Sequence, residues 1–369
     1  MTVTCPVCRS ETPQGAAFCS RCTNPIGVVS LSELSASDQT VALRALFQSL
    51  ATSASSEPAA EPDDLFHAYL SAYWLRPETA LILYAEASTI ATLKPDMPPG
   101  PWLDLGCGDG THAALYSGWR FDPSFDCFQS VNLAARDIYD HFEPAEFAAP
   151  VLHRGRVIDL GVDIKPSAIA RASHLGVFAD VQLADAARLP VADGNMAVIF
   201  SNMLRDLGDS LPDALAEVHR ILRPDGRLIF SAMTPAYADS LHFAPAAKQA
   251  ADAGQTLLAQ QFSRLDRGRS TFCRQQLSSA QWHRLLSAAG FTLEATIPLV
   301  GAEAIRFWDI GLRPFSIPLI RQAATWRAAG VLPHIKPGAV ELLSTLLAGL
   351  RSNLNAGHTC MHMVVAKPA

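Results

Sequence analysis

A glycine-rich turn directly follows a short apolar segment near residue 105. Residues 103–110 read Leu-Asp-Leu-Gly-Cys-Gly-Asp-Gly. Glycines let a backbone turn sharply and pass close to a ligand that a Cβ atom would block. Three glycines alone are a weak signal, because a ligand-free strand–turn–helix has the same pattern. The carboxylate of Asp104 is costly to bury without a partner, so it could serve a cationic group of a ligand.

Further polar residues follow apolar segments where strands are expected to end. Asp163 closes the segment 157–163, and Asp185 follows the next one. The apolar residues 197–200 then lead into Ser201 and Asn202. Any one of these could be a solvated loop residue. Their order makes that reading improbable, because open α/β sheets bind ligands along the edge where parallel strands end.

Four cysteines near the N-terminus have the spacing of metal ligands. Cys5 and Cys8 form one C-x-x-C pair, and Cys19 and Cys22 form another. Two such pairs supply the four tetrahedral ligands of a structural zinc ion. Four unrelated cysteines or a redox pair are the alternatives, but a redox pair needs no second copy. We predict a small zinc ribbon over residues 1–27, which could dock a protein partner.

The residues between this ribbon and the main domain predict a helix followed by a linker. Leucines and Phe47 at helical spacing predict a short helix over residues 34–50. Residues 51–64 have no apolar period and are typical of a flexible linker. We therefore expect a helix and linker over 28–64 and one main domain over 65–369.

Residues 100–298, taken in order, resemble the class I S-adenosylmethionine-dependent methyltransferases, specifically the branch related to quinone C-methyltransferases. The sequence Leu-Arg-Pro-Asp-Gly-Arg-Leu-Ile-Phe at 222–230 is a strong marker of this family. Residues 360–367 fit its last strand more loosely. The resemblance implies an α/β, Rossmann-like fold: a seven-stranded, mostly parallel sheet with helices on both faces.

The resemblance also implies the contacts to S-adenosylmethionine. The turn from Asp104 to Gly110 would wrap the methionine moiety. Asp163 would bond the ribose hydroxyls, since one carboxylate can accept two hydroxyl protons. Ile164 would pack against the adenine, and Asp185 would accept from its amine. The predicted cofactor-binding residues are Asp104, Gly106, Cys107, Gly108, Gly110, Asp163, Ile164, Asp185, Ala186, Ser201 and Asn202.

The spacing of these motifs departs from the family in one respect. The interval from Gly110 to Asp163 is more than twice the roughly 20 residues expected between such a turn and the ribose acid. We therefore expect an insertion at about 117–155, which leaves Asp159 as an alternative ribose acid. Two further insertions, at about 234–277 and 301–357, are expected to build a lid over the substrate.

The expected catalytic residues are less defined. The family commonly carries a histidine or a Glu-His pair after the fourth strand, where this chain has Arg205-Asp206. A sulfonium methyl is already electrophilic, so a general base is needed only when the acceptor must lose a proton. The candidates for such a base are Asp206 and His112, with Asp109 as a further possibility.

The composition and charge of the chain argue against nucleic-acid binding, a membrane span and secretion. The 369-residue chain is 49% hydrophobic and 17% charged, which suits a large core. A formal charge of −6 lowers the expectation of nucleic-acid binding. No apolar run approaches the roughly 20 residues that cross a bilayer, no signal peptide is expected, and the clustered cysteines indicate a reducing compartment. We expect a cytoplasmic protein.

The first hypothesis is methyl transfer from S-adenosylmethionine to a small-molecule or lipid-linked acceptor, by in-line displacement at the sulfonium methyl. An RNA methyltransferase that uses the zinc ribbon for RNA contact is the first alternative. A catalytically inactive cofactor-binding interaction protein is the second, motivated by Arg205-Asp206. A nicotinamide dehydrogenase fits the glycine spacing less well.

Overall fold

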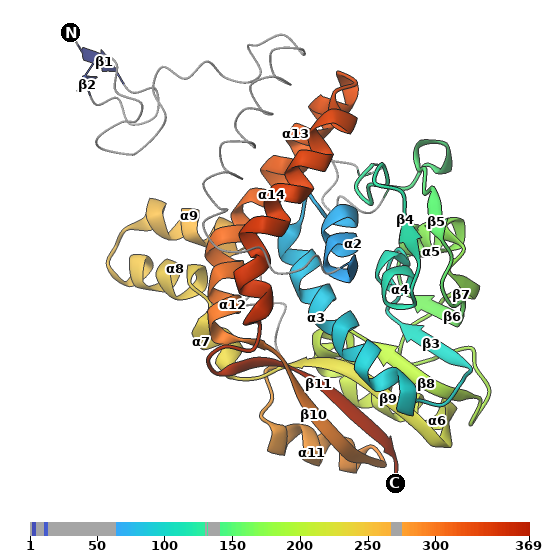
Figure 1. Cartoon of the computed structure of the whole chain (residues 1–369). Coiled ribbons are helices and arrows are strands. Elements are labelled where there is room, and N and C mark those ends of the chain that lie inside the picture. The colour runs from blue at the N-terminus through green and yellow to red at the C-terminus, as the bar shows by residue number, and fades with distance from the viewer. Residues whose placement is uncertain (1, 5–10, 14–63, 130, 132–140, 267–274) are drawn as a thin grey trace.

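The computed structural model describes residues 2–4, 11–13, 64–129, 131, 141–266 and 275–369. Its centre is a seven-stranded sheet with the order β10-β11-β9-β8-β3-β6-β7 (Figure 1). The strands are β3 (Trp102–Leu105), β6 (Ile158–Asp163), β7 (Phe178–Leu183), β8 (Met196–Ser201), β9 (Leu222–Met233), β10 (Phe291–Gly301) and β11 (Thr359–Pro368). Only β11 runs antiparallel to its neighbours. The predicted seven-stranded, mostly parallel sheet is confirmed.

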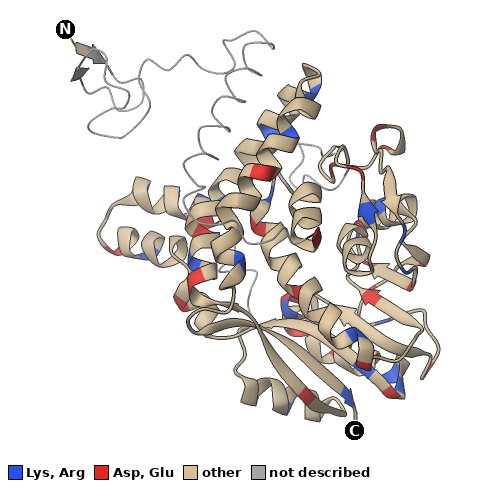
Figure 2. Ribbon diagram, in the orientation of Figure 1, with Lys and Arg blue, Asp and Glu red and all other residues tan. Residues whose placement is uncertain are grey.

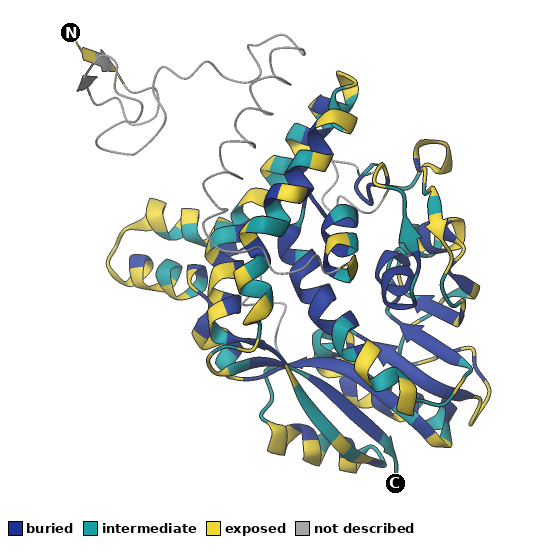
Figure 3. Cartoon of the chain, in the orientation of Figure 1, coloured by how far each residue is buried: buried dark blue, intermediate teal, exposed yellow. Residues whose placement is uncertain are grey.

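Both faces of the sheet are covered, because side chains alternate along each strand. In β3, Trp102 belongs to the apolar cluster of α2, α3 and α4, while Leu103 belongs to the cluster of α6 and α11. All six residues of β8 are buried, as expected for a parallel strand covered on both sides. Figure 3 shows this burial along the central strands and along α3.

The helices begin and end at recognisable signals. The longer ones are α2 (Asp64–Ala72), α3 (Pro77–Leu93), α4 (Thr111–Tyr116), α5 (Pro166–Leu175), α6 (Leu211–Ile221), α8 (Phe243–Asp252), α9 (Thr256–Asp266), α11 (Ser279–Ala288), α13 (Ser316–Ala328) and α14 (Leu332–Ser352). Proline opens α5, and Gly176 ends it at φ 72°. Ser278 and Gln281 form a capping box at the start of α11.

Shorter helical segments connect these elements. They are η2 (Lys94–Asp96), η3 (Pro144–Glu146), η4 (Leu204–Asp206), η5 (Gly208–Ser210), α7 (Ala236–Ser240), α12 (Ala302–Phe307), the π-helix η6 (Trp308–Leu312) and η7 (Arg313–Phe315). In the segment marked by the family motif, Leu222 pairs with Met196 and Arg227 with Val198, so residues 223–226 bulge out of the ladder within β9.

The regions expected to be insertions pack onto the sheet domain. Between α4 and β6, a two-stranded antiparallel sheet forms from β4 (Arg120–Phe121) and β5 (Val151–His153). Phe125 from this region is buried, and Nζ of Lys336 in α14 donates to its carbonyl oxygen. Arg327 of α13 forms an ion pair of 2.6 Å with the buried Asp126. The domain limits given above stay predictions.

At the N-terminus, the described residues form a pair of short strands. β1 (Thr2–Thr4) and β2 (Glu11–Pro13) run antiparallel, with Thr2 opposite Pro13. The four cysteines of the predicted zinc ribbon, the predicted helix over 34–50 and the linker up to residue 63 lie outside the described residues. Figure 2 shows Lys and Arg interspersed with Asp and Glu along the described elements. No described helix is long and apolar enough to span a membrane.

Candidate active site

A cavity of about 670 Å³ lies where β3, β6 and β8 end. Its floor contains the glycine turn, Asp163 and the residues after β8. The lining also includes residues of α3, α5 and η6. Of the predicted site residues, those that line it are Asp104, Gly106, Cys107, Gly108, Asp109, His112, Asp163, Ile164, Asn202 and Asp206. Motifs up to 102 residues apart in the sequence, from Asp104 to Asp206, therefore share one space.

The glycine turn has the backbone shape of a ligand cradle. Gly106, Gly108 and Gly110 have φ of 79°, 57° and 80°, a region that residues with a Cβ rarely adopt. A Cβ on Gly106 would lie 2.6 Å from Cγ of Met203, whereas nothing lies within 4 Å of the corresponding point on Gly108. The turn thus leaves open space above Gly108, which fits a cofactor lying close to the backbone.

Asp163 connects the turn to the end of β6. Its Oδ2 accepts from the backbone N–H of Gly108 at 3.0 Å, and Oδ1 accepts from that of Lys165 at 2.9 Å. Each oxygen keeps a further lone pair for a ligand hydroxyl. The alternative acid, Asp159, accepts from the backbone N–H of Trp102 at the other end of the strand and does not line the cavity. The geometry therefore favours Asp163 as the ribose acid.

Asp104 is a buried acid on the cavity wall. Burial raises its pKa to about 6, helped by the negative charges of Asp163 and Glu86. His112 and a hydrogen bond of 2.9 Å from the Tyr116 hydroxyl oppose that rise. A carboxyl group in this environment ionises more readily when a cation comes close. Asp104 can thus respond electrostatically to the positive charge of a bound ligand.

Four predicted cofactor residues do not line the cavity. A Cβ on Gly110 would lie 3.1 Å from Val177 and 3.2 Å from Phe178, so this glycine lets α4 pack closely on the sheet. The buried Ser201 donates to the carbonyl oxygen of Leu105 at 2.7 Å and supports the loop after β8. The exposed Asp185 accepts from the N–H of Ala187 at 2.9 Å. The fourth, Ala186, is half-buried beside it.

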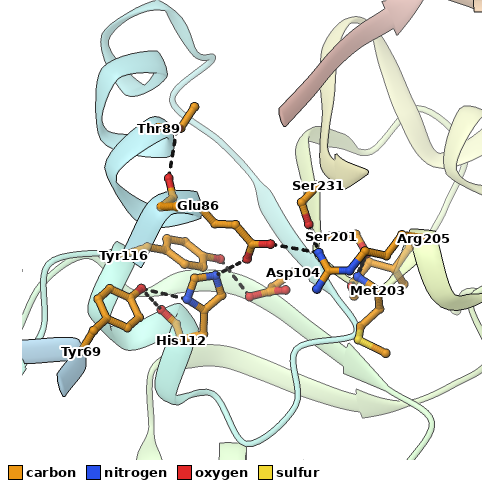
Figure 4. Close-up of polar contacts among 12 residues, drawn as sticks. Tyr69, Glu86, Thr89, Asp104, His112, Tyr116, Ser201, Met203, Arg205 and Ser231 are labelled. Atoms are coloured by element: carbon orange, nitrogen blue, oxygen red, sulfur yellow. Dashed lines mark hydrogen bonds and ion pairs between the residues drawn. The ribbon is translucent and has the colours of Figure 1, made fainter. Parts of the chain in front are cut away.

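His112 lines the cavity, but its ring nitrogens face two protein groups (Figure 4). Nδ1 is 2.8 Å from the hydroxyl of Tyr69, and Nε2 is 3.4 Å from Oε2 of Glu86. Both partners are fully buried. A general base needs a ring nitrogen within reach of the acceptor's proton. This arrangement makes His112 a poor base, and Asp206 remains the better placed of the two candidates.

Several further cavity residues come from outside the predicted cofactor motifs, and two of them, Tyr237 and Trp308, lie in the insertions expected to build a lid. Tyr73 and Tyr237 come from segments far from the glycine turn, and both line the cavity. Trp308, on η6, donates through Nε1 to the carbonyl oxygen of Glu78 at 2.9 Å and so connects the last insertion to α3. The buried Asp309 accepts from Arg313 at 2.6 Å and from the backbone N–H of His242 at 2.8 Å. These contacts fix the position of Trp308 and Arg313, which both line the cavity.

Within the described part of the chain, no group of three or more His, Cys, Asp or Glu side chains could hold a metal ion. The predicted zinc ligands, Cys5, Cys8, Cys19 and Cys22, are not among those residues. The zinc ribbon therefore stays a prediction.

Comparison with known proteins agrees with this site. Residues 145–230 match the family model described as a methyltransferase domain. This segment of the chain is similar to methyltransferase domains. The matched segment includes Asp163 and β6 through most of β9, but it begins after the glycine turn.

Two curated proteins are similar to parts of this chain. A malonyl-[acyl-carrier protein] O-methyltransferase of Halorhodospira halophila is 26% identical over 147 residues, covering 33% of this chain and 48% of that protein. A second one, from Coxiella burnetii, is 41% identical over 54 residues, covering 15% and 19%. The alignments thus span about half or less of each relative. Among solved structures, a possible histamine N-methyltransferase from Thermotoga maritima has 17% identity and a TM-score of 0.37, with 63% and 84% of the two chains covered.

Proposed function

We propose that this chain transfers a methyl group from S-adenosylmethionine to a small-molecule or lipid-linked acceptor. The observation that carries the proposal is the single cavity in which three strand ends meet, with open space above Gly108 beside the carboxylate of Asp163. The methyltransferase domain match and the methyltransferase relatives support the same cofactor. When bound, S-adenosylmethionine supplies an electrophilic methyl group on a sulfonium.

In this proposal the residues of the chain have separate tasks. The backbone around Gly106 and Gly108 holds the amino-acid end, Asp163 holds the ribose, and Ile164, which is 66% exposed, offers its side chain to the adenine. The protein mainly places the acceptor in line with the methyl group, a contribution that can be large when both reactants are held in position. Asp206 is the proposed base for an acceptor that loses a proton.

The residues that line the cavity indicate what kind of acceptor it could bind. The aromatic and aliphatic side chains of Tyr73, Ile82 and Trp308 line the cavity and suit an acceptor with an apolar body. The two curated relatives are named for malonyl-[acyl-carrier protein], so an acyl group on a carrier protein is one such acceptor. The formal charge of −6 disfavours RNA as the acceptor. An inactive cofactor-binding protein remains the alternative that a turnover assay tests.

We further propose that Cys5, Cys8, Cys19 and Cys22 hold one structural zinc ion. Paired strands lie on either side of the first C-x-x-C in the sequence, with Thr4 opposite Glu11. The described residues on the two sides of this motif, Thr4 and Glu11, are therefore paired neighbours. Four thiolates leave no open coordination position, so the ion would have a structural role.

Transfer of a labelled methyl group tests the proposal. The full chain is incubated with methyl-labelled S-adenosylmethionine and, in separate reactions, a metabolite extract, malonyl-carrier protein and RNA. We expect label in the extract or on the carrier protein, and none when Asp163→Asn replaces the wild type. Label appearing only in RNA would overturn the assignment of the acceptor. An absence of transfer with bound cofactor would favour the inactive protein.

A further inference from the structure

An ion pair between Glu86 and Arg205 lies at the edge of the cavity, which Arg205 helps to line. Glu86 of α3 is fully buried, and its Oε1 accepts from Nη1 of Arg205 at 3.0 Å (Figure 4). Nη1 of Arg205 also donates to the hydroxyl of Ser231, in β9. The second carboxylate oxygen of Glu86 faces His112 on α4. One carboxylate thus connects α3, α4 and the loop after β8.

Each of these elements contributes to the cavity. The α3 helix supplies Ile82 and Leu83, and the loop after β8 supplies Asn202 and Met203. Met203 lies against the glycine turn, since a Cβ on Gly106 would overlap it. A displacement of residues 202–206 would therefore also displace the glycine turn, through the contact of Met203 with Gly106. The ion pair is a direct contact between α3 and the segment after β8.

The electrostatics show that this pair is held as two charges. Burial works against the carboxylate of Glu86, but hydrogen bonding from His112 and the charge of Arg205 lower its pKa to about 2. Removing one charge of a buried pair leaves the other uncompensated. Nε of Arg205 is 3.8 Å from Oδ2 of Asp206, so an unbalanced guanidinium has a second carboxylate within reach on the cavity side.

We propose that Glu86 and Arg205 are positioning residues of the cofactor site. Their ion pair holds residues 202–206 against the glycine turn and restrains the Arg205 guanidinium, which is 3.8 Å from Asp206, from moving closer to that carboxylate. This inference rests on the proposed function, because it names the residues that set the geometry of the same site. It also gives a role to Arg205, which stands where the family resemblance implies a histidine: its guanidinium is bound by Glu86 and Ser231 at the edge of the cavity.

The test compares Glu86→Gln with the wild type, at a temperature where circular dichroism shows both to be folded. Titration calorimetry with S-adenosylmethionine is expected to show binding weakened by roughly ten-fold or more, because small displacements in a preorganised site are costly. Hydrogen exchange of residues 202–206 is expected to become faster. Arg205→Lys, which keeps the charge, should recover part of the lost affinity relative to Arg205→Met.

A matched control is available at a distance from the cavity. Glu294 of β10 pairs with Arg227 at 2.5 Å and with Lys367 at 3.1 Å, and none of the three lines the cavity. Glu294→Gln should leave cofactor affinity unchanged.

The outcomes distinguish a failure of the positioning role from a failure of the proposed function. Wild-type affinity in folded Glu86→Gln would overturn the positioning role, and so would a lower melting temperature with unchanged affinity. If Glu86→Gln does not fold, equal affinities for Arg205→Lys, Arg205→Met and the wild type would overturn it. A wild type that binds no S-adenosylmethionine would instead contradict the proposed function.

Discussion

The affinity of the chain for S-adenosylmethionine is expected to depend on the ionisation of Asp104. This carboxyl group is buried on the cavity wall, and its pKa is raised from 3.8 to about 6. The cofactor is cationic at its sulfonium and amino groups, so the ionised acid favours binding and the protonated acid does not. Affinity should therefore rise as the pH passes upward through about 6 and fall as it passes downward.

The size of the effect follows from the fraction of ionised Asp104. With a pKa of about 6, about a tenth of the molecules carry the charge at pH 5 and about nine tenths at pH 7. If only the ionised form binds, the apparent dissociation constant falls about ten-fold between these values. Asp104→Asn should bind more weakly than the wild type at pH 7, and its affinity should change little across this range.

Titration calorimetry at pH 5, 6 and 7 measures this dependence directly. S-adenosylhomocysteine, which has the amino group but no sulfonium charge, is the control ligand and should show a smaller change. Glu294→Gln is the control variant and should follow the wild type. A flat wild-type profile, or an equally steep one in Asp104→Asn, would refute the assignment of the charge effect to Asp104.

Three further changes give distinct readouts. Gly106→Ala should weaken cofactor binding at least several-fold in calorimetry, because φ of 79° disfavours a Cβ that would lie 2.6 Å from Met203; unchanged affinity would contradict the cradle. Trp282→Ala should lower the free energy of unfolding by roughly 3–5 kcal/mol in a denaturant titration without changing cofactor affinity, since this 1%-exposed side chain of α11 packs against Phe230 of the sheet and does not line the cavity. Elemental analysis should find about one zinc per wild-type chain and a strongly reduced amount in Cys19→Ser, as expected if four thiolates bind one ion; equal zinc in both would exclude Cys19 as a ligand.

The sheet was predictable from the sequence because its strands carry strong local signals. Trp102–Leu105 has the limits expected from the apolar segment before the glycine turn, and the last strand is one residue longer at each end than the predicted 360–367. Apolar segments followed by glycine or acid residues define both the strand and the edge where ligands bind. Each of these patterns lies within a few neighbouring residues, so it can be recognised in the sequence without knowing how the chain packs.

The residues around Glu86 could not be predicted in the same way. Glu86 and Arg205 are 119 positions apart and are brought together only when α3 packs on the sheet. The apolar residues 80–85 before Glu86 are consistent with burial of this acid, but nothing in the sequence of α3 identifies Arg205 as its partner. His112 was predicted as a base from its place in the turn region, and its partners Tyr69 and Glu86 became visible only in three dimensions.

Titration calorimetry of the full chain with S-adenosylmethionine, repeated with Asp163→Ala, tests the central claim most directly. We expect one cofactor bound per wild-type chain. Asp163→Ala should lose binding while it still unfolds cooperatively. Asp159→Ala, which removes the other acid of the same strand, should keep the wild-type affinity. A wild-type chain that shows no binding, or a folded Asp163→Ala variant that binds as tightly as the wild type, would contradict it.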